Sequence, residues 1–390
     1  MSHVALLIPT VDRIGGAERQ VLLLAKGLRT RGWRVTVVAL SGHGGDALAN
    51  LEAVGAGFVT IEMRKGLADP RGWIRLARWL KKERPDILHA HLPHAAWMAR
   101  WGRLLVPVRV VVDTLHSSST GGLGRHWGYR VSDWLTDNVT AVGQTVSDAH
   151  VAAGMASPGK VSVVTNGVDT SSFRPDRATR SAVRNRLSMG EEFIWLAAGR
   201  LDAVKDYPTL LSAMTQVPPC GRLLIAGSGP LLDELRQLST RFGLDSRVGF
   251  LGFEPDLRSW MQAADGFVLS SLWEGLPMGL LEAAACALPA VATDVPGTRE
   301  AIGEGKTGWL TPAGDAAALA RAMTTMMQIP AEERLAMGNR ARQRVVKCNE
   351  IETVLDMWED LYGALLKENT APARWGRAHA KANAMRRIPG

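Results

Sequence analysis

Short runs of apolar, often β-branched residues alternate along the chain with longer segments whose apolar residues recur every three or four positions. In the first half, segments 17–30 and 71–84 carry this helical spacing. The apolar runs between and after them lie at 4–8, 35–40, 58–61, 86–90, 108–114, 139–142 and 161–164. Such alternation predicts strands of a parallel sheet, with helices covering both of its faces.

The same alternation restarts after residue 190. Its apolar runs lie at 193–198, 222–226, 247–251, 266–270 and 289–293. The chain therefore predicts an α/β protein with two Rossmann-like domains in tandem. We expect them to face each other across a cleft, because open sheets of this kind bind ligands at the carboxyl ends of their strands and domain interfaces are common ligand sites. The predicted parts are an N-terminal domain at 1–170, a linker at 171–192, a C-terminal domain at 193–350, a helix at 351–368 and a basic, disordered tail at 369–390.

Composition excludes several classes of protein. Of the 390 residues, 46% are hydrophobic and 22% are charged, as in an ordinary folded protein rather than a disordered or fibrous one. The longest apolar runs are far shorter than a membrane span, and the first residues lack the pattern of a signal peptide. The three cysteines are widely spaced, which favours a reducing compartment, without a disulfide framework or structural zinc.

The net charge of +8 is unevenly distributed. Residues 1–170 carry 20 basic and 13 acidic residues, 171–365 carry 20 and 24, and 366–390 carry 6 and 1. A basic first half suggests an anionic partner, such as nucleic acid, an anionic lipid or a phosphorylated substrate. A surface charge that only keeps the protein soluble is the alternative.

Two motifs that follow predicted strands suit a phosphorylated ligand. IGGAE at 14–18 opens a helix, and Gly15 and Gly16 would let backbone amides approach a phosphate. GRLDAVK at 199–205 places the cations Arg200 and Lys205 between a strand and a helix, where they could neutralise a diphosphate. Taken singly, the first motif is also typical of an ordinary turn, and the second of two solvated surface charges.

A third motif suits a sugar. EGLPMGLLE at 274–282 places Glu274 before a predicted helix and Glu282 about one turn inside it. Carboxylates accept hydrogen bonds from vicinal hydroxyls, and the intervening amides could cap a phosphate. Alternatively, two glutamates at the start of a helix interact favourably with the helix dipole, and no ligand is needed to explain them.

The order and spacing of these motifs resemble the retaining GT-B glycosyltransferases of family 4, also called group 1. The resemblance covers nearly the whole chain and includes DILHAH at 86–91, TLHS at 114–117, VTNGVD at 164–169, LIAGSGP at 224–230 and VGFLGF at 248–253. It implies a GT-B fold whose C-terminal helix returns to the N-terminal domain. The N-terminal domain would bind the acceptor, and the C-terminal domain a nucleotide diphosphate sugar.

The resemblance also implies roles for single residues. Arg200 and Lys205 would hold the donor diphosphate, Glu274 the sugar hydroxyls and Glu282 the ribose. His116 would be the active-site histidine, catalytic together with Glu274. The remaining implied donor contacts are Gly15, Gly16, Phe253, Gly275, Leu276 and Met278. No metal and no other cofactor are expected. Departing from the family, Asp206 stands where a glycine is usual.

A membrane surface is the expected acceptor side. On a helix at 71–84, the cations Arg71, Arg75, Arg78 and Lys82 form one stripe, flanked by Trp79, and Trp97 and Trp101 follow one turn apart. Cations beside apolar groups suit an anionic lipid interface, where tryptophan is favoured. The alternative is a solvated basic face over buried tryptophans. The glycine-rich segment 117–128 is expected to be a mobile loop beside the acceptor.

The sequence therefore predicts a transferase that moves a hexose or N-acetylhexosamine, from a uridine-diphosphate sugar by family frequency, to a membrane-associated acceptor. A polyprenyl-diphosphate-linked saccharide or a glycolipid would be the acceptor, in cell-surface polysaccharide synthesis at the cytoplasmic face of the inner membrane. A sugar-nucleotide epimerase and a basic nucleic-acid-binding protein remain alternatives, although no nucleic-acid partner is expected. The sequence carries no signal for an oligomeric state.

Overall fold

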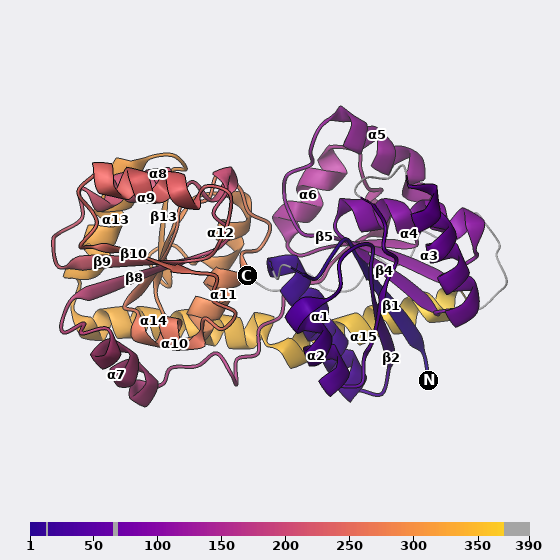
Figure 1. Cartoon of the computed structure of the whole chain (residues 1–390), viewed down its shortest axis with the longest axis horizontal. Coiled ribbons are helices and arrows are strands. Elements are labelled where there is room, and N and C mark those ends of the chain that lie inside the picture. Colours follow the sequence, from indigo (N-terminus) through magenta and orange to yellow (C-terminus); the bar gives the residue numbers. More distant parts are fainter. Residues whose placement is uncertain (13–14, 65–68, 370–390) are drawn as a thin grey trace. The chain divides into compact units, whose positions relative to one another are not determined.

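The chain folds into two compact units (Figure 1). The computed structural model describes residues 1–12, 15–64 and 69–369, and the predicted tail lies outside them apart from Asn369. Unit 1 contains Met1–Thr165 together with the chain from Val354 onward, and unit 2 contains Asn166–Thr353.

Unit 1 is built on a parallel sheet. In its described part seven strands follow the order β3-β2-β1-β4-β5-β6-β7. Their bounds are β1 His3–Ile8, β2 Arg34–Ala39, β3 Gly57–Thr60, β4 Ile87–His91, β5 Val110–Leu115, β6 Asn138–Ala141 and β7 Val161–Val163. Every residue of β1, β4 and β5 is buried, which explains why these strands appear in the sequence as continuous rather than alternating apolar runs.

Helices alternate with these strands. They are α1 Gly16–Thr30, α2 Gly45–Ala53, α3 Pro70–Glu83, α4 Pro93–Leu105, α5 Leu123–Ser132, α6 Gln144–Ala152 and the short η1 Asp133–Leu135 and η2 Pro158–Lys160. Residues 123–128 were expected to be part of a loop, and this expectation is wrong because they form the start of α5.

The terminal helix α15, Ile351–Glu368, returns to unit 1, as the resemblance implied. Its residues Leu355, Trp358, Tyr362 and Leu365 are buried. Arg31, directly after α1, forms ion pairs with Asp356 and Glu359. Leu355 packs against Gly27 of α1, where a Cβ would lie 2.2 Å from the Leu355 Cδ1 atom.

Unit 2 is built on a second parallel sheet. Its described strands follow the order β10-β9-β8-β11-β12-β13. Their bounds are β8 Phe193–Ala198, β9 Gly221–Ala226, β10 Val248–Gly252, β11 Gly266–Leu269, β12 Ala290–Thr293 and β13 Gly308–Thr311. The predicted α/β class with two Rossmann-like halves is confirmed, and all twelve predicted strands lie within two residues of their expected bounds. The sequence pattern missed β13.

The helices of unit 2 include one inside the segment predicted to be a linker. This helix, α7 Arg177–Arg186, buries Val183 in a core cluster that α10 also joins, and Arg180 donates to the Ala264 carbonyl. The other helices are η3 Ala203–Lys205, α8 Tyr207–Met214, α9 Leu232–Arg241, α10 Arg258–Ala263, α11 Met278–Ala285, α12 Pro296–Ala301, α13 Ala316–Gln328 and α14 Ala331–Asn349.

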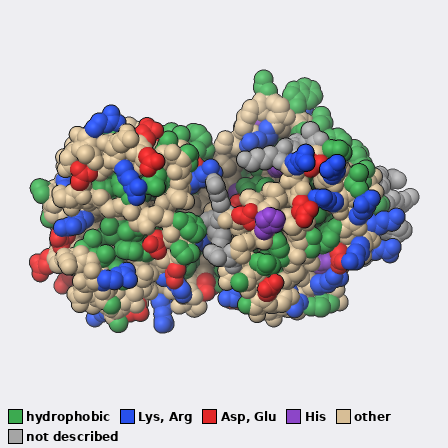
Figure 2. All heavy atoms as spheres, in the orientation of Figure 1, with side chains coloured by type: hydrophobic (Ala, Val, Ile, Leu, Met, Phe, Trp, Pro, Cys, Tyr) green, Lys and Arg blue, Asp and Glu red, His purple; other side chains and the backbone are tan. Residues whose placement is uncertain are grey.

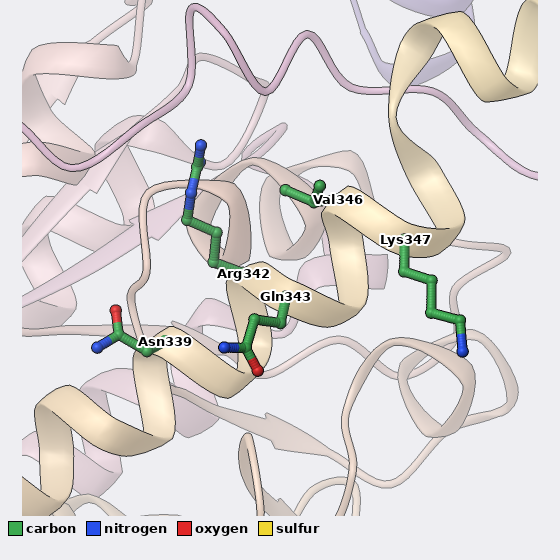
Figure 3. A pocket seen from close by; sticks show the side chains of 5 residues that line it. All are labelled: Asn339, Arg342, Gln343, Val346 and Lys347. Carbon is green, nitrogen blue, oxygen red and sulfur yellow. The ribbon is translucent and has the colours of Figure 1, made fainter.

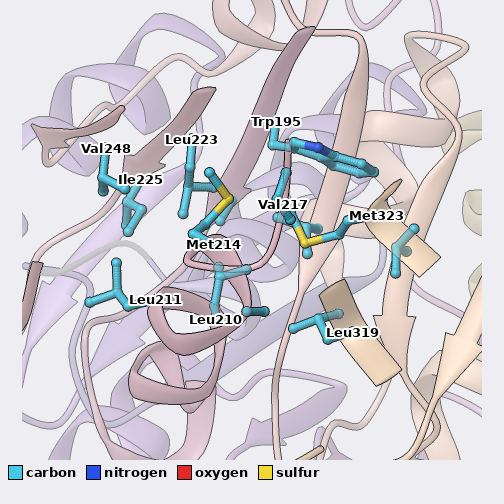
Figure 4. Close-up of a cluster of buried hydrophobic side chains, with 14 of the residues drawn as sticks. Trp195, Leu210, Leu211, Met214, Val217, Leu223, Ile225, Val248, Leu319 and Met323 are labelled. Carbon is cyan, nitrogen blue, oxygen red and sulfur yellow. The ribbon is translucent and has the colours of Figure 1, made fainter. Parts of the chain in front are cut away.

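Alternate residues of each strand supply a different core on each face of the unit 2 sheet. Trp195 and Leu223 belong to the cluster with α8 and α13, shown in Figure 4, whereas Ile194 and Leu224 belong to the cluster with α7 and α10. The two cores fix the strands rigidly, so the loops at the strand ends have a firm base.

Candidate active site

Three of the predicted donor residues of unit 2 follow the carboxyl ends of adjacent strands. β8 and β11 are neighbours in the sheet, although β9 and β10 lie between them in the chain. Arg200 and Lys205 follow β8, and Glu274 follows β11. Such a reversal of strand order is where open α/β sheets bind ligands.

Lys205 and Glu274 form an ion pair. The Lys205 Nζ atom lies 2.5 Å from the Glu274 Oε1 atom, and the hydroxyl of Ser271 donates to the same oxygen at 2.6 Å. The two side chains are 19% and 12% exposed. The fold therefore joins the predicted diphosphate cation to the predicted sugar ligand, 69 residues apart in the sequence.

Arg200 is the more accessible cation. Its side chain is 66% exposed, and its Nε atom lies 3.5 Å from a carboxylate oxygen of Asp202. Asp202 also accepts a hydrogen bond from the Val204 amide at the start of η3. Asp206 precedes α8 in a left-handed conformation (φ 46°), which is the conformation that the usual glycine would adopt most easily. Arg200 is thus more exposed to solvent than Lys205 and Glu274.

Glycines allow the surrounding loops to pack backbone against backbone. A Cβ at Gly227 would lie 1.9 Å from the Gly199 carbonyl oxygen, and a Cβ at Gly297 would lie 1.9 Å from that of Gly275. These contacts hold the loop with Arg200 against the loop after β9, and the loop with Gly275 against the start of α12. The glycines of LIAGSGP are therefore required by packing, whether or not they contact a ligand.

Buried side chains and a hydrogen bond fix the segment from Gly275 to the start of α11. Leu276 and Met278 are 7% and 8% exposed, so the predicted donor contacts at these residues would have to be made by the backbone. The Leu276 backbone carbonyl accepts a hydrogen bond of 2.9 Å from the Asn166 side-chain amide, and the Asn166 backbone carbonyl accepts one of 3.0 Å from the Asn349 side-chain amide. Asn166 was not among the predicted site residues, although it lies in the motif VTNGVD.

Glu282 and Phe253 are the two other donor residues predicted in unit 2. Glu282 is on α11 and is 2% exposed. One turn later, burial and the Glu282 carboxylate raise the pKa of the Cys286 thiol to about 12. Phe253, which follows β10, is 51% exposed and is available for contact with a flat ring. The ribose and base contacts of these residues remain predictions.

In unit 1, Gly15 and Gly16 lie at the start of α1, as predicted. Gly15 is the residue before the helix, and its amide donates to the Glu18 carboxylate at 3.0 Å. Both glycines are exposed. A phosphate at the Gly15 amide would therefore have to displace the Glu18 side chain, whose negative charge would also oppose it.

His116 belongs to a group of histidines at the ends of β4 and β5. Its Nε2 atom lies 3.1 Å from the Nδ1 atom of His91, and the His91 ring lies 4.0 Å from that of His89. Burial lowers the pKa of His116 to about 4 and holds that of His91 well below its usual range. Both rings are therefore neutral at pH 7.

The tautomer of this pair follows from the burial of His91. Its other ring nitrogen, Nε2, is buried and has no hydrogen-bond partner among the described residues. An orphaned N–H is rarer in proteins than an orphaned acceptor, so His91 is expected to donate from Nδ1 and leave Nε2 unprotonated. His116 then accepts at Nε2 and carries its proton on Nδ1. This arrangement makes His116 a hydrogen-bond donor towards a ligand.

The residues predicted to contact a membrane differ in their exposure. Arg71, Arg75, Arg78 and Lys82 of α3 are exposed, and Arg75 forms an ion pair with Glu62. The tryptophans Trp79, Trp97 and Trp101 are each partly buried. No helix in the ranges that the structure describes is long and apolar enough to span a bilayer.

A hollow of about 430 Å³ elsewhere in unit 2 does not involve the predicted site. It is lined by Asn339, Arg342, Gln343, Val346 and Lys347, all on α14 (Figure 3). Arg342 donates to backbone carbonyls, including that of Phe173, and so has a structural role here. None of the predicted donor residues lines this hollow.

Two family models match the chain, one in each half. The model described as Glycosyltransferase Family 4 matches residues 14–172, and the model described as Glycosyl transferases group 1 matches residues 180–344.

Individual proteins match over most of the chain. The chain is 31% identical over 366 residues to the phosphatidyl-myo-inositol mannosyltransferase of Mycobacterium leprae (strain TN), and the match covers 88% of this chain and 92% of that protein. It is 26% identical over 310 residues to the UDP-Gal:alpha-D-GlcNAc-diphosphoundecaprenol alpha-1,3-galactosyltransferase of Escherichia coli, covering 76% and 80%. The crystal structure of Anabaena Alr3699/HepE with UDP and glucose has a TM-score of 0.82 at 23% identity, covering 92% and 99%, which supports the GT-B fold class.

Proposed function

Because the chain belongs to the family 4, or group 1, glycosyltransferases, we propose that it transfers a hexose or N-acetylhexosamine from a UDP-sugar to a lipid-linked acceptor with retention of the anomeric configuration. Family membership favours this transferase over the epimerase and the nucleic-acid-binding protein. The observation that carries the proposal is the ion pair of Lys205 with Glu274, close in sequence to Arg200, at the carboxyl ends of β8 and β11.

The names of relatives support the choice of substrates. The E. coli relative is named for UDP-galactose and for an acceptor linked to diphosphoundecaprenol, and the M. leprae relative is named for a phosphatidyl-inositol acceptor. The Anabaena structure contains UDP and glucose. We infer by analogy a UDP-sugar donor, an acceptor such as a polyprenyl-diphosphate-linked saccharide or a glycolipid, and a role in cell-surface polysaccharide synthesis at the cytoplasmic face of the inner membrane.

The chemistry follows from the charges in unit 2. Arg200 and Lys205 stabilise the negative charge that develops as the bond from the anomeric carbon to the diphosphate breaks. A new bond forms from that carbon to the acceptor hydroxyl oxygen on the same face, the hydroxyl proton passes to the departing diphosphate oxygen, and UDP leaves. Glu274 accepts hydrogen bonds from the sugar hydroxyls. Since two side-chain cations neutralise the diphosphate, the reaction is proposed to need no metal.

Titration calorimetry with UDP, GDP and ADP tests the donor assignment. We expect UDP to bind best, and the double variant Arg200→Ala/Lys205→Ala to lose this binding while its circular dichroism spectrum stays that of the folded protein. Binding that is indifferent to both substitutions would overturn the assignment.

Two further measurements test the reaction itself. NMR spectroscopy of the product should show the anomeric configuration of the donor, and activity should survive in excess EDTA. An inverted product, or conversion of the UDP-sugar without any acceptor, would contradict the proposed reaction.

A further inference from the structure

Helix α5 carries a row of exposed apolar side chains. Leu123, Trp127 and Val131 are 79%, 67% and 44% exposed, and their spacing of four residues puts them on one side of the helix. Trp134, in the following η1, is 54% exposed. We call these four residues the α5 ridge. Figure 2 shows hydrophobic side chains projecting where α5 lies.

The opposite side of α5 is firmly anchored. The helix comes so close to α4 at Gly128 that a Cβ there would lie 1.8 Å from a ring atom of Trp97. The guanidinium of Arg100, on α4, donates to the Tyr129 carbonyl at 3.1 Å and to the Ser132 hydroxyl at 3.2 Å. The exposure of the ridge is therefore a consequence of how α5 is packed and not of a frayed helix.

The helix that packs against α5 also exposes apolar side chains. Leu104 and Leu105 end α4 and are 49% and 59% exposed. Both α5 and η1 pack against α4. Apolar side chains gathered on neighbouring elements in this way mark an interaction surface more often than scattered single residues do.

The charge on α5 is entirely basic. Arg125 and Arg130 are exposed, and the helix contains no acidic residue. The next acidic residue along the chain, Asp133, lies 3.6 Å from the ammonium group of Lys160. Helix α3, which also packs against α4, exposes the cations Arg71, Arg78, Lys81 and Lys82. The partner that complements this combination is both apolar and negatively charged.

We propose that the α5 ridge inserts into the interface of an anionic lipid bilayer. Trp127 would lie at the level of the headgroups, where its ring and indole N–H are both accommodated. Trp134 would contribute its ring alone, because its indole N–H donates to the Val131 carbonyl at 2.9 Å. Arg125 and Arg130 would contact lipid phosphates. This inference deepens the proposed function, because it supplies the surface that brings the enzyme to a lipid-linked acceptor. It moves the main membrane contact from Trp79, Trp97 and Trp101, which are partly buried, to α5.

Co-sedimentation of the full chain with vesicles tests this proposal. The vesicles contain equal parts of phosphatidylglycerol and phosphatidylcholine. The variant Leu123→Ser/Trp127→Ser/Val131→Ser should partition at least tenfold more weakly than the wild type. The matched control, Phe242→Ser/Leu335→Ser/Val346→Ser, removes three side chains of unit 2 that are 39%, 56% and 41% exposed, and it should partition like the wild type.

Further measurements distinguish the possible failures. Calorimetry with UDP should give the same affinity for the ridge variant and the wild type, which separates this inference from the donor assignment. If the triple variant does not fold, the single variant Trp127→Ser replaces it, because it changes only one exposed side chain. This variant should also bind vesicles more weakly than the wild type. The proposal is overturned if the ridge variant sediments with vesicles as strongly as the wild type. It is also overturned if light scattering shows that the wild type is a dimer and the ridge variant a monomer.

Discussion

The contact between Lys205 and Glu274 leads to a prediction that separates their two roles. If Lys205 holds the diphosphate, Lys205→Ala removes a charge-assisted hydrogen bond to it, which contributes about 1.5–3 kcal/mol. At about 1.4 kcal/mol per tenfold change, UDP should bind about 10- to 150-fold more weakly. The lost ammonium also leaves the Glu274 carboxylate, 12% exposed, without the cation that lies 2.5 Å away. The uncompensated Glu274 carboxylate would repel the diphosphate, so we expect the loss of UDP affinity to lie towards the upper end of this range.

The substitution Glu274→Gln should behave differently. It removes a negative charge beside the proposed diphosphate and leaves the Lys205 ammonium in place, so UDP should bind as well as to the wild type or more tightly. Sugar transfer should nevertheless be lost, because the carboxylate that accepts the sugar hydroxyls is gone. Transfer is thus expected to fall in both variants, whereas UDP affinity falls only in Lys205→Ala.

Calorimetry with UDP on both single variants and on the double variant measures this difference, and the double-mutant cycle gives the energy that couples the two side chains. Lys306→Ala, which removes an exposed cation elsewhere in unit 2, is the matched control and should leave the affinity unchanged. If Glu274→Gln weakens UDP binding as much as Lys205→Ala, the pair acts only as a structural ion pair and the division of roles is wrong.

Three other predictions concern stability and pH. Arg100→Met should lower the free energy of unfolding in urea by about 3–5 kcal/mol, since it leaves the fully buried Asp113 unpaired, and adding Asp113→Leu should restore most of the loss. Asn166→Ala should cost about 1–3 kcal/mol and weaken UDP binding in calorimetry, because it leaves the Leu276 carbonyl unpaired. Burial lowers the pKa of His116 from 6.5 to about 4, so the unfolded chain binds this proton first. Unfolding free energy should therefore fall by up to about 3 kcal/mol between pH 6.5 and 4, and less in His116→Gln.

The strands were the most predictable part of the fold. A parallel strand that is buried on both faces must be apolar along its whole length, as in β1 and β8, and such runs are visible without any knowledge of the tertiary structure. β13, with the sequence GWLT, was missed because four residues that begin with glycine carry too little pattern.

Helix α5 shows where local sequence misleads. Glycines at 121, 122, 124 and 128 favour a loop, since glycine is among the poorest helix formers. The helix is stabilised by Arg100, which donates hydrogen bonds to its carboxyl-terminal turn. It also packs against Trp97, and only a glycine at position 128 allows that close contact. Both reasons lie on α4 and are invisible in the sequence of α5 itself.

The sequence by itself determined which residue types follow each strand, and hence that Arg200, Lys205 and Glu274 lie at the same edge of one sheet. Only the tertiary structure decided which of them touch. The contacts of Lys205 with Glu274, and of Asn166 with the Leu276 carbonyl, join residues 69 and 110 positions apart. Their distances depend on how strands and loops pack against a common core, and no local spacing encodes that packing.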